Sequence, residues 1–202
     1  MGHSTERLVL ASASVARRKL LADAGVEFLV EPAHIDERGL RAKLAADGAD
    51  AGRCALALAE AKAVTVSSRH PDALIIGADQ ILVCENRWFD KPAHLGEARR
   101  QLMALRGRSH VLETAVCAVR NGERLWQAKS DPRLTMRWFR DGFLDDYLAV
   151  EGEAILGSVG AYRLEGRGVQ LFEWIDGDYF AVLGLPLLEL LRFLRGRGSL
   201  RD

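Results

Sequence analysis

The chain of 202 residues lacks an excess of either charge and a long apolar run. It has 28 lysine and arginine residues against 28 aspartate and glutamate residues, so its formal net charge is zero. Nonspecific binding to a nucleic acid polymer or a membrane surface depends on a basic excess, so we expect neither partner. No apolar run approaches the roughly 20 residues of a membrane span. No apolar segment of the kind found in a secretory signal follows the first seven residues, so we expect a cytoplasmic protein.

The chain is also poor in cysteine and in several common catalytic motifs. Cys54, Cys84 and Cys117 are odd in number, widely spaced and without a C-x-x-C pair. This pattern argues against a disulfide framework and a structural zinc site, and it suits reduced thiols. A Walker A loop, an H-E-x-x-H helix and a G-x-S-x-G elbow are all missing, which removes the usual sequence support for those three chemistries.

The opening segment carries the clearest signal for a ligand. A short apolar strand over Leu8–Leu10 leads into a loop with Ser12 and Ser14, and a helix is expected over residues 15–24. Ser14 can cap that helix, whose free N–H groups and dipole would attract a phosphate. Arg17 adds a fork of donors that matches phosphate oxygens. The alternative is a capped helix with a solvated basic first turn, although cations at that end oppose the dipole.

Apolar runs alternate with helical patterns along the rest of the chain. This alternation predicts an α/β protein with a mixed sheet, and two lobes around a cleft are natural at this length. An Asn-Gly pair indicates a hairpin turn at residues 121–122. The expected strands cover residues 28–30, 73–76, 81–84, 109–120, 123–128, 134–139 and 169–175, and the further helices cover residues 50–68, 95–106, 141–150 and 183–194.

Four charged residues are ambiguous when each is taken alone. Asp79 comes directly after a buried apolar strand, where open α/β sheets place ligand chemistry, but it could also be a turn former or cap. Lys62 lies in an alanine-rich helix close to a glutamate and could be an exposed helix residue. Lys91 precedes a proline and could be a solvated surface lysine. Glu37 follows Ile35 and Asp36 on an expected loop.

The ordered set of segments nevertheless resembles a known family. Ser12, Ser14 and Arg17 resemble the S-x-S-P-R-R segment of the Maf family of nucleoside triphosphate pyrophosphatases. The other matching segments follow in the family's order over essentially the whole chain: Ile35-Asp36-Glu37, Leu58-Ala59 with Lys62-Ala63, Gly77-Ala78-Asp79-Gln80, Lys91-Pro92, Gly160-Ala161-Tyr162 with Glu165-Gly166 and Gly168, and Gly184-Leu185-Pro186-Leu187.

The resemblance implies one Maf-like domain over residues 1–202. It implies an elongated, two-lobed α/β fold with a mixed sheet and flanking helices, similar to that of the inosine triphosphate pyrophosphatases. The implied reaction is hydrolysis of a nucleoside triphosphate to a monophosphate and pyrophosphate, with a divalent cation. A homodimer is also implied. The older name of the family leaves a second reading, a non-catalytic nucleotide-binding regulator of cell division.

The resemblance also implies roles for individual residues. Asp79 matches the general base, with Lys62 and Lys91 as catalytic cations. The phosphate-binding residues would be Ser12, Ser14 and Arg17, and the metal ligands Asp79 and Glu37. A free aspartate is a weak base at pH 7, so ligation of a metal that acidifies a bound water is the favoured route. Oxygen ligands favour Mg²⁺ or Mn²⁺ over zinc.

Three positions depart from the family pattern: Val15 replaces a proline, Ala16 an arginine or tryptophan, and Asp90 a glycine. Asp90 adds a negative charge, or a further metal ligand, beside the expected triphosphate.

Ala16, Gln80 and Glu165 match the base-specificity positions. A carboxylate can accept hydrogen bonds from N1–H and N2–H₂ of guanine and suits the positive charge of a methylated guanine. Gln80 and Glu165 also resemble the residues of members that act on 7-methyl-GTP, whereas the dTTP/UTP-type members have Arg, Thr and Gln at the three positions. The resemblance therefore favours the 7-methyl-GTP subfamily, with the dTTP/UTP type as the alternative.

Overall fold

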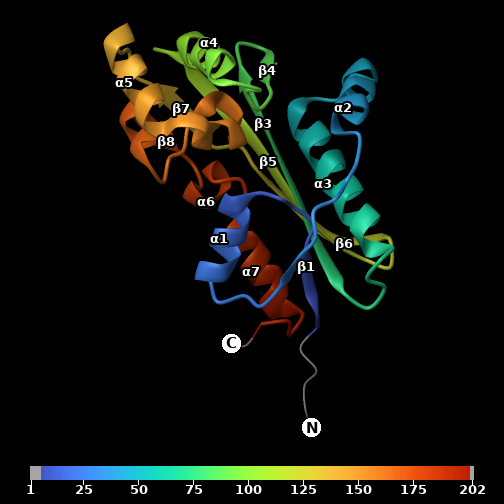
Figure 1. Ribbon diagram of the computed structural model, residues 1–202. Coiled ribbons are helices and arrows are strands. Elements are labelled where there is room, and N and C mark those ends of the chain that lie inside the picture. Colours follow the sequence, from blue (N-terminus) through green and yellow to red (C-terminus); the bar gives the residue numbers. More distant parts are fainter. Residues whose placement is uncertain (1–5, 201–202) are drawn as a thin grey trace.

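The computed structural model describes residues 6–200. Residues 1–5, which belong to the segment examined for a secretory signal, and residues 201–202 lie outside the described part. The described residues form a mixed eight-stranded sheet with strand order β2-β1-β3-β5-β7-β8, with β4 paired to β3 and β6 to β5. Helices flank this sheet (Figure 1), so the expected α/β class is confirmed.

The strands are β1 (Leu8–Leu10), β2 (Leu29–Val30), β3 (Leu74–Cys84), β4 (Arg87–Phe89), β5 (Ser109–Arg120), β6 (Glu123–Ser130), β7 (Arg133–Met136) and β8 (Phe172–Asp176). The α-helices are α1 (Val15–Asp23), α2 (Glu37–Ala46), α3 (Ala51–Ser67), α4 (Leu95–Leu105), α5 (Asp141–Glu151), α6 (Tyr179–Val182) and α7 (Leu187–Gly196). Three 3₁₀ segments, η1 (Gly152–Gly157), η2 (Val159–Ala161) and η3 (Arg167–Leu171), fill the glycine-rich region.

The long strand β3 forms the centre of the sheet. It is parallel to β1 over Leu74–Ile76 and antiparallel to β5 over Ile75–Val83. The expectation that Asp79 follows a strand end is wrong, because Asp79 lies inside β3 opposite Ala115. β3 continues to pair with β5 up to Val83, whereas its pairing with β1 ends at Ile76. One edge of β3 is therefore open beside Asp79, and the crevice forms at the carboxyl end of β1 instead.

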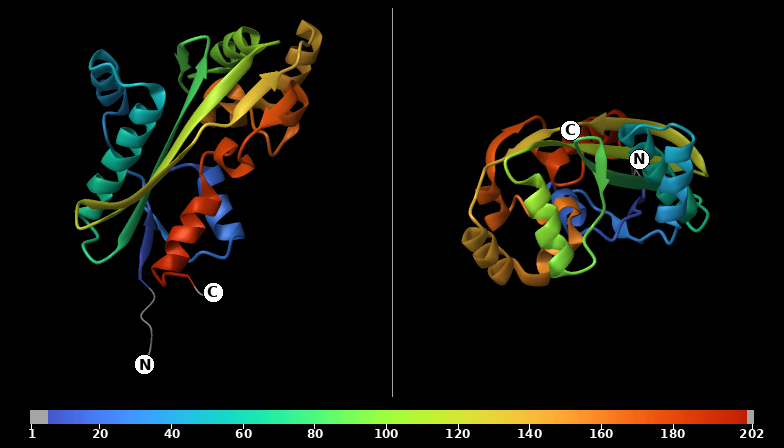
Figure 2. Two further views of the ribbon diagram at one scale, coloured as in Figure 1. Left: turned by 180° about the vertical axis from the view of Figure 1, so that it is seen from behind. Right: turned by 90° about the horizontal axis from the view of Figure 1, so that it is seen from above.

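Helices cover both faces of the sheet. Figures 1 and 2 show α2 and α3 on one side, and α1 and α7 on the other near the two termini. Helices α4 and α5 lie at the far end with β7 and β8. Each group has its own buried hydrophobic cluster, and β3 contributes to all three, with Ile75 in the α3 cluster, Ile76 in the α1–α7 cluster and Leu82 in the α4–α5 cluster.

Helix α3 approaches β3 closely because small residues meet at the contact. A Cβ added at Gly77 would lie 2.1 Å from the carbonyl oxygen of Ala59 and 2.9 Å from Cβ of Ala63. These contacts leave no room for a larger residue in the strand. The close approach brings the side chain of Lys62, on the same helix, against the sheet.

Two expected segments differ in the structure. Residues 35–37 were expected to form a loop, but Asp36 caps α2 by accepting a 2.9 Å hydrogen bond from the N–H of Gly39, and Glu37 is the first helical residue. The expected helix over residues 183–194 begins only at Leu187. Pro186 is its N-terminal cap residue and follows the separate short helix α6.

The strands near the far end are shorter than expected. β7 ends at Met136 rather than at residue 139. β8 begins at Phe172, because residues 167–171 form the 3₁₀ segment η3. In the described part of the chain, we find no helix with the length and apolar character needed to cross a membrane.

Candidate active site

A cleft of about 410 Å³ opens where the β1–α1 loop, α2, α3, β3 and the β4–α4 connection meet the glycine-rich region and the α6–α7 loop. Segments from nearly the whole length of the chain line this one space. Every site residue expected from the sequence lines the cleft: Ser12, Ser14, Ala16, Arg17, Glu37, Lys62, Asp79, Gln80, Lys91 and Glu165. The structure thus brings the expected residues together, while their chemical roles stay predictions.

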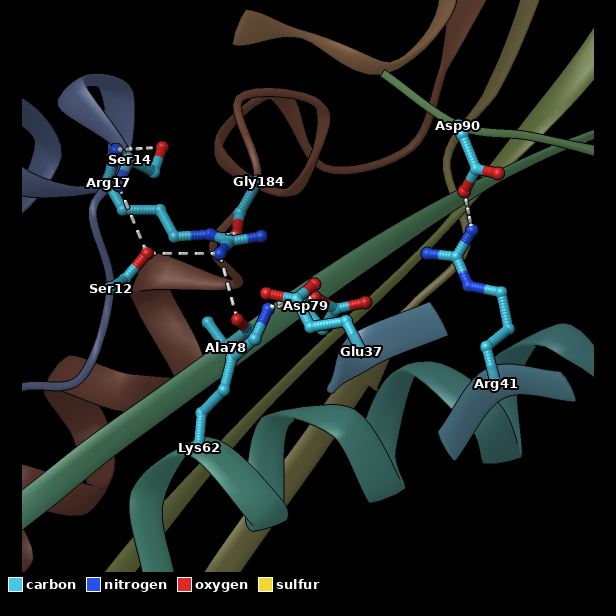
Figure 3. A network of polar contacts seen from close by, with 10 residues as sticks. All are labelled: Ser12, Ser14, Arg17, Glu37, Arg41, Lys62, Ala78, Asp79, Asp90 and Gly184. Atoms are coloured by element: carbon cyan, nitrogen blue, oxygen red, sulfur yellow. Dashed lines mark hydrogen bonds and ion pairs between the residues drawn. The ribbon is translucent and has the colours of Figure 1, made fainter. Parts of the chain in front are cut away.

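The β1–α1 loop is built around Arg17. Ser14 caps α1, as expected, by accepting a 3.3 Å hydrogen bond from the N–H of Arg17. The buried guanidinium donates to the carbonyl oxygens of Gly184, at 2.7 Å, and Ala78, at 2.8 Å. It also donates to Oγ of Ser12 at 3.2 Å (Figure 3). Arg17 therefore joins three separate segments at the cleft wall, a role that the sequence did not indicate.

Burial of Arg17 has an electrostatic cost that nearby carboxylates partly offset. Loss of solvent lowers the pKa of Arg17, whereas the charges of Asp79 and Glu37 act in the opposite direction. An arginine stays protonated in a protein, so the guanidinium remains a fixed positive charge at the cleft. Its NH2 group makes no hydrogen bond to the described residues and is not fully buried. That group is left for a ligand.

Lys62, Asp79 and Glu37 form a compact charged group at the floor of the cleft. The ammonium of Lys62 lies 2.6 Å from Oδ1 of Asp79 and 3.0 Å from Oε2 of Glu37 (Figure 3). The side chains of Lys62 and Asp79 are only 10% and 7% exposed, whereas that of Glu37 is half-exposed. Lys62 is therefore not the solvated helix residue that was the alternative interpretation. The close packing of α3 on β3 explains its burial.

The two carboxylates have the chemistry of a site for a hard divalent cation. Oδ2 of Asp79 is buried and has no hydrogen-bond partner within the described residues. Glu37 supplies a second carboxylate, whose Oε2 lies 3.0 Å from the same ammonium. Residues 6–200 contain no group of three or more side chains that would form a complete metal cage. Mg²⁺ typically uses one or two carboxylates together with water and phosphate oxygens, so these residues fit that ion.

Lys91, in the connection between β4 and α4, also lines the cleft. Partial enclosure and the positive charges of Arg17 and Lys62 lower its pKa, while Glu37 and Asp79 act in the opposite direction. The adjacent Asp90 forms an ion pair with Arg41 of α2. An arginine therefore already engages the carboxylate that was expected to add negative charge or to bind a metal.

Arg38 and Arg41 line the cleft but were missed from the sequence. Both belong to α2, which was not expected as a helix. The spacing could have indicated one of them, because Glu37 and Arg41 share a helix face once the helix begins at Asp36.

Gln80 and Glu165 are expected to read the base, and the structure gives both protein partners. The amide nitrogen of Gln80 donates to Oγ1 of Thr114 and to the carbonyl oxygen of Ala181, both at 2.8 Å. These contacts tie β3 to α6 and leave the amide oxygen as the free acceptor. The carboxylate of Glu165 lies 3.5 Å from Nε of Arg163. The adjoining apolar wall, which can hold a flat ring, consists of Leu112, Val159, Tyr162, Leu164, Val182 and Leu183.

The fold and the cleft define a class: an α/β protein whose cleft arranges cations and carboxylates around a space for a polyanionic ligand. Residues 7–197 match the family model described as Maf-like protein. The chain belongs to the Maf family.

Similar proteins cover almost its full length. The chain is 52% identical to a "Nucleoside triphosphate pyrophosphatase" of Granulibacter bethesdensis, over 96% of this chain and 98% of that protein. It is 53% identical to a protein of the same name from Paramagnetospirillum magneticum, over 95% of this chain and 99% of that protein. It is 50% identical to a "7-methyl-GTP pyrophosphatase" of Rhizobium meliloti, over 96% of this chain and 97% of that protein.

Proposed function

We propose that this protein is a nucleoside triphosphate pyrophosphatase that hydrolyses the bond between the α- and β-phosphates, giving a nucleoside monophosphate and pyrophosphate. The observation that carries the proposal is the Lys62–Asp79–Glu37 group in a cleft that also presents Arg17 and Lys91. A buried aspartate and a half-exposed glutamate beside several cations suit the activation of water next to a polyanion. The names of the similar proteins support the same reaction.

The cations of the cleft would bind and orient the phosphate chain. A triphosphate carries about four negative charges, so its hydrolysis depends on neutralising charge and holding the reacting atoms in line. Lys62 and Lys91 supply ammonium groups, and the start of α1 supplies N–H donors behind Ser14. Arg17 would contribute the NH2 group that the protein leaves free, while its other donors hold the loop in shape.

Asp79 is the proposed general base. Its Oδ2, buried and without a protein partner, would accept the proton of the water that attacks the α-phosphorus. Lys62 holds Oδ1 of the same carboxylate and fixes its direction. Asp79 and Glu37 would hold a divalent cation, Mg²⁺ or Mn²⁺, which when bound acidifies water and neutralises phosphate charge.

The proposed substrate is 7-methyl-GTP. Glu165 and the amide oxygen of Gln80 are acceptors that suit the N–H donors of a guanine edge, and the carboxylate suits the added positive charge. The name of the Rhizobium meliloti protein supports this choice. One contact favours the dTTP/UTP alternative, because Arg163 already neutralises Glu165 in part. Binding of 7-methyl-GTP would require the Glu165 carboxylate to leave Arg163 and form hydrogen bonds with the base instead.

The proposal is tested by pyrophosphate release from 7-methyl-GTP, GTP, dTTP, UTP and CTP with Mg²⁺ or Mn²⁺. We expect release from wild type with 7-methyl-GTP as the best substrate, and loss of release in Asp79→Asn. Asp145→Asn, on the exposed surface of α5, is the matched control. If wild type binds nucleotides without hydrolysing any of them, the reading as a non-catalytic nucleotide-binding regulator replaces the proposed function.

We also propose that the whole chain acts as one Maf-like unit and forms a cytoplasmic homodimer. The edge strand β8, on which Trp174 is 69% exposed, supports self-association. Sedimentation equilibrium of wild type and Trp174→Ser checks the dimer: we expect a dimeric mass for wild type and a weaker dimer for the variant.

A further inference from the structure

Helix α2 is held over the cleft by few contacts. None of its residues is buried, and Leu40 and Leu44 are only partly buried against the α3 cluster. Within the described residues, two ion pairs join α2 to other elements: Glu37 with Lys62 of α3, and Arg41 with Asp90 after β4. Arg41–Asp90 is the pair that joins α2 to the segment after β4, and both residues line the cleft (Figure 3).

The two partners differ in their surroundings. The side chain of Arg41 is 19% exposed, and its Nε is buried without a partner in the described part of the chain. The side chain of Asp90 is 69% exposed and lies beside Lys91. Without Arg41, Asp90 would place a negative charge next to Lys91, which is expected to bind phosphate. The carboxylate of Asp90 would then repel the negatively charged phosphate. Arg41 cancels this charge.

We propose that Arg41 and Asp90 are a positioning pair, which ties α2 to the segment after β4 and keeps the Asp90 carboxylate from repelling a triphosphate. The pair sets the distance between Glu37, which opens α2, and Lys91, which follows Asp90. Neither member touches the reacting atoms. The kinetic test of this inference rests on the proposed function. The inference also predicts how strongly the variants bind a polyphosphate, which can be measured without any reaction.

The kinetic test is a double-mutant cycle of Arg41→Ala, Asp90→Asn and the double variant. We expect Arg41→Ala to raise KM about tenfold, the effect of one unbalanced charge, with a smaller change in kcat. The double variant should recover the part of that loss that comes from the uncompensated carboxylate, but its KM should stay above that of wild type because the tie between α2 and the segment after β4 is still missing. If Arg41 instead binds phosphate directly, the double variant stays as impaired as Arg41→Ala, and the proposal is overturned.

A binding measurement separates this inference from the proposed function. Calorimetry with inorganic tripolyphosphate should show weaker binding to Arg41→Ala and recovery in the double variant, whether or not any nucleotide is hydrolysed. Arg99→Ala removes an arginine from an ion pair on the surface of α4 and is the matched control. If wild type hydrolyses no nucleotide but tripolyphosphate binding follows this order, the pair stands and the pyrophosphatase proposal fails. Equal binding by wild type and Arg41→Ala overturns the pair.

Discussion

Nε of Arg17 donates a 2.7 Å hydrogen bond to the carbonyl oxygen of Gly184, a residue 167 positions further along the chain. The same guanidinium also reaches the carbonyl oxygen of Ala78 in β3. The loop at the start of α1 is therefore held by the central strand and by the segment between α6 and α7. An arginine expected to bind phosphate is thus first a structural tie between distant parts of the cleft.

Arg17→Lys tests this tie. A lysine keeps the positive charge, but it cannot match the planar fork that reaches Gly184, Ala78 and Ser12 at once. We expect turnover to fall by about 100-fold, as when one fixed donor is lost from a site of this kind, and the urea midpoint to fall as well. Arg18→Lys, on the exposed side of the same helix, is the control. Unchanged turnover and stability in Arg17→Lys would contradict the assignment.

Lys62→Met and Asp79→Asn should differ in stability. Removing Lys62 leaves the buried carboxylate of Asp79 without its cation, and we expect a loss of about 3 kcal/mol in the free energy of unfolding. Removing the charge of Asp79 leaves Lys62 paired with Glu37, so the loss should be smaller. Urea denaturation at pH 7 measures both, and the double variant should be more stable than Lys62→Met. A larger loss in Asp79→Asn than in Lys62→Met would refute this ordering.

His110 should make stability depend on pH. Burial lowers the pKa of His110 from 6.5 to about 4, and its Nε2 lies 2.9 Å from the hydroxyl of Tyr162. Between these values the unfolded chain binds a proton that the folded protein does not bind, so stability falls as the pH falls below 6.5. The expected contribution is about 2 kcal/mol lost between pH 7 and pH 5. Urea denaturation of wild type and His110→Gln at the two pH values measures it.

The control for His110 is His34→Gln, which changes an exposed histidine. It should keep the full pH dependence of wild type, whereas His110→Gln should lose the part that comes from the buried ring. An equal pH dependence in wild type and His110→Gln would show that His110 titrates alike in the folded and unfolded states.

Glu165→Gln tests the reading of the base. The substitution keeps the shape of the side chain but removes the negative charge that would attract a methylated purine. We expect the ratio of kcat/KM for 7-methyl-GTP to that for UTP to fall about tenfold, since a fully engaged polar contact is worth at least this much. Glu153→Gln, an exposed glutamate of η1, is the control. An unchanged ratio would mean that Glu165 does not contact the base.

Several elements of the fold followed from local signals. The strand over Leu8–Leu10, the cap at Ser14 and the long strand over Ser109–Arg120 all match the structure. Capping depends on a side chain and a backbone N–H three residues apart. A short apolar run, or a long alternating one, favours a strand over other secondary structures. These features depend on residues close together in the sequence, so they can be predicted before the fold is known.

What could not be predicted depends on tertiary contacts. The position of Asp79 inside β3 requires the ladder with β5, which lies more than 30 residues away. The burial of Lys62 requires α3 to lie close to Gly77. Helix α2 was missed because it buries no residue, and its apolar face consists of Leu40 and Leu44, which pack only in part against the α3 cluster. Its arginines, and with them the pair between Arg41 and Asp90, were missed for the same reason.

The participation of β3 in all three hydrophobic clusters has a consequence for how the molecule opens. Ile75, Ile76 and Leu82 anchor different helices on one continuous strand. No cluster can come apart completely without disturbing the strand that the others share, so the two ends of the sheet should melt cooperatively. Amide protons of β3 that donate to β5 should then exchange with solvent only through global unfolding, whereas those of α2 exchange through local openings. Asp79, the proposed general base, would then lie on a slowly exchanging strand, whereas Glu37 and Arg41 lie on a helix that exchanges through local openings.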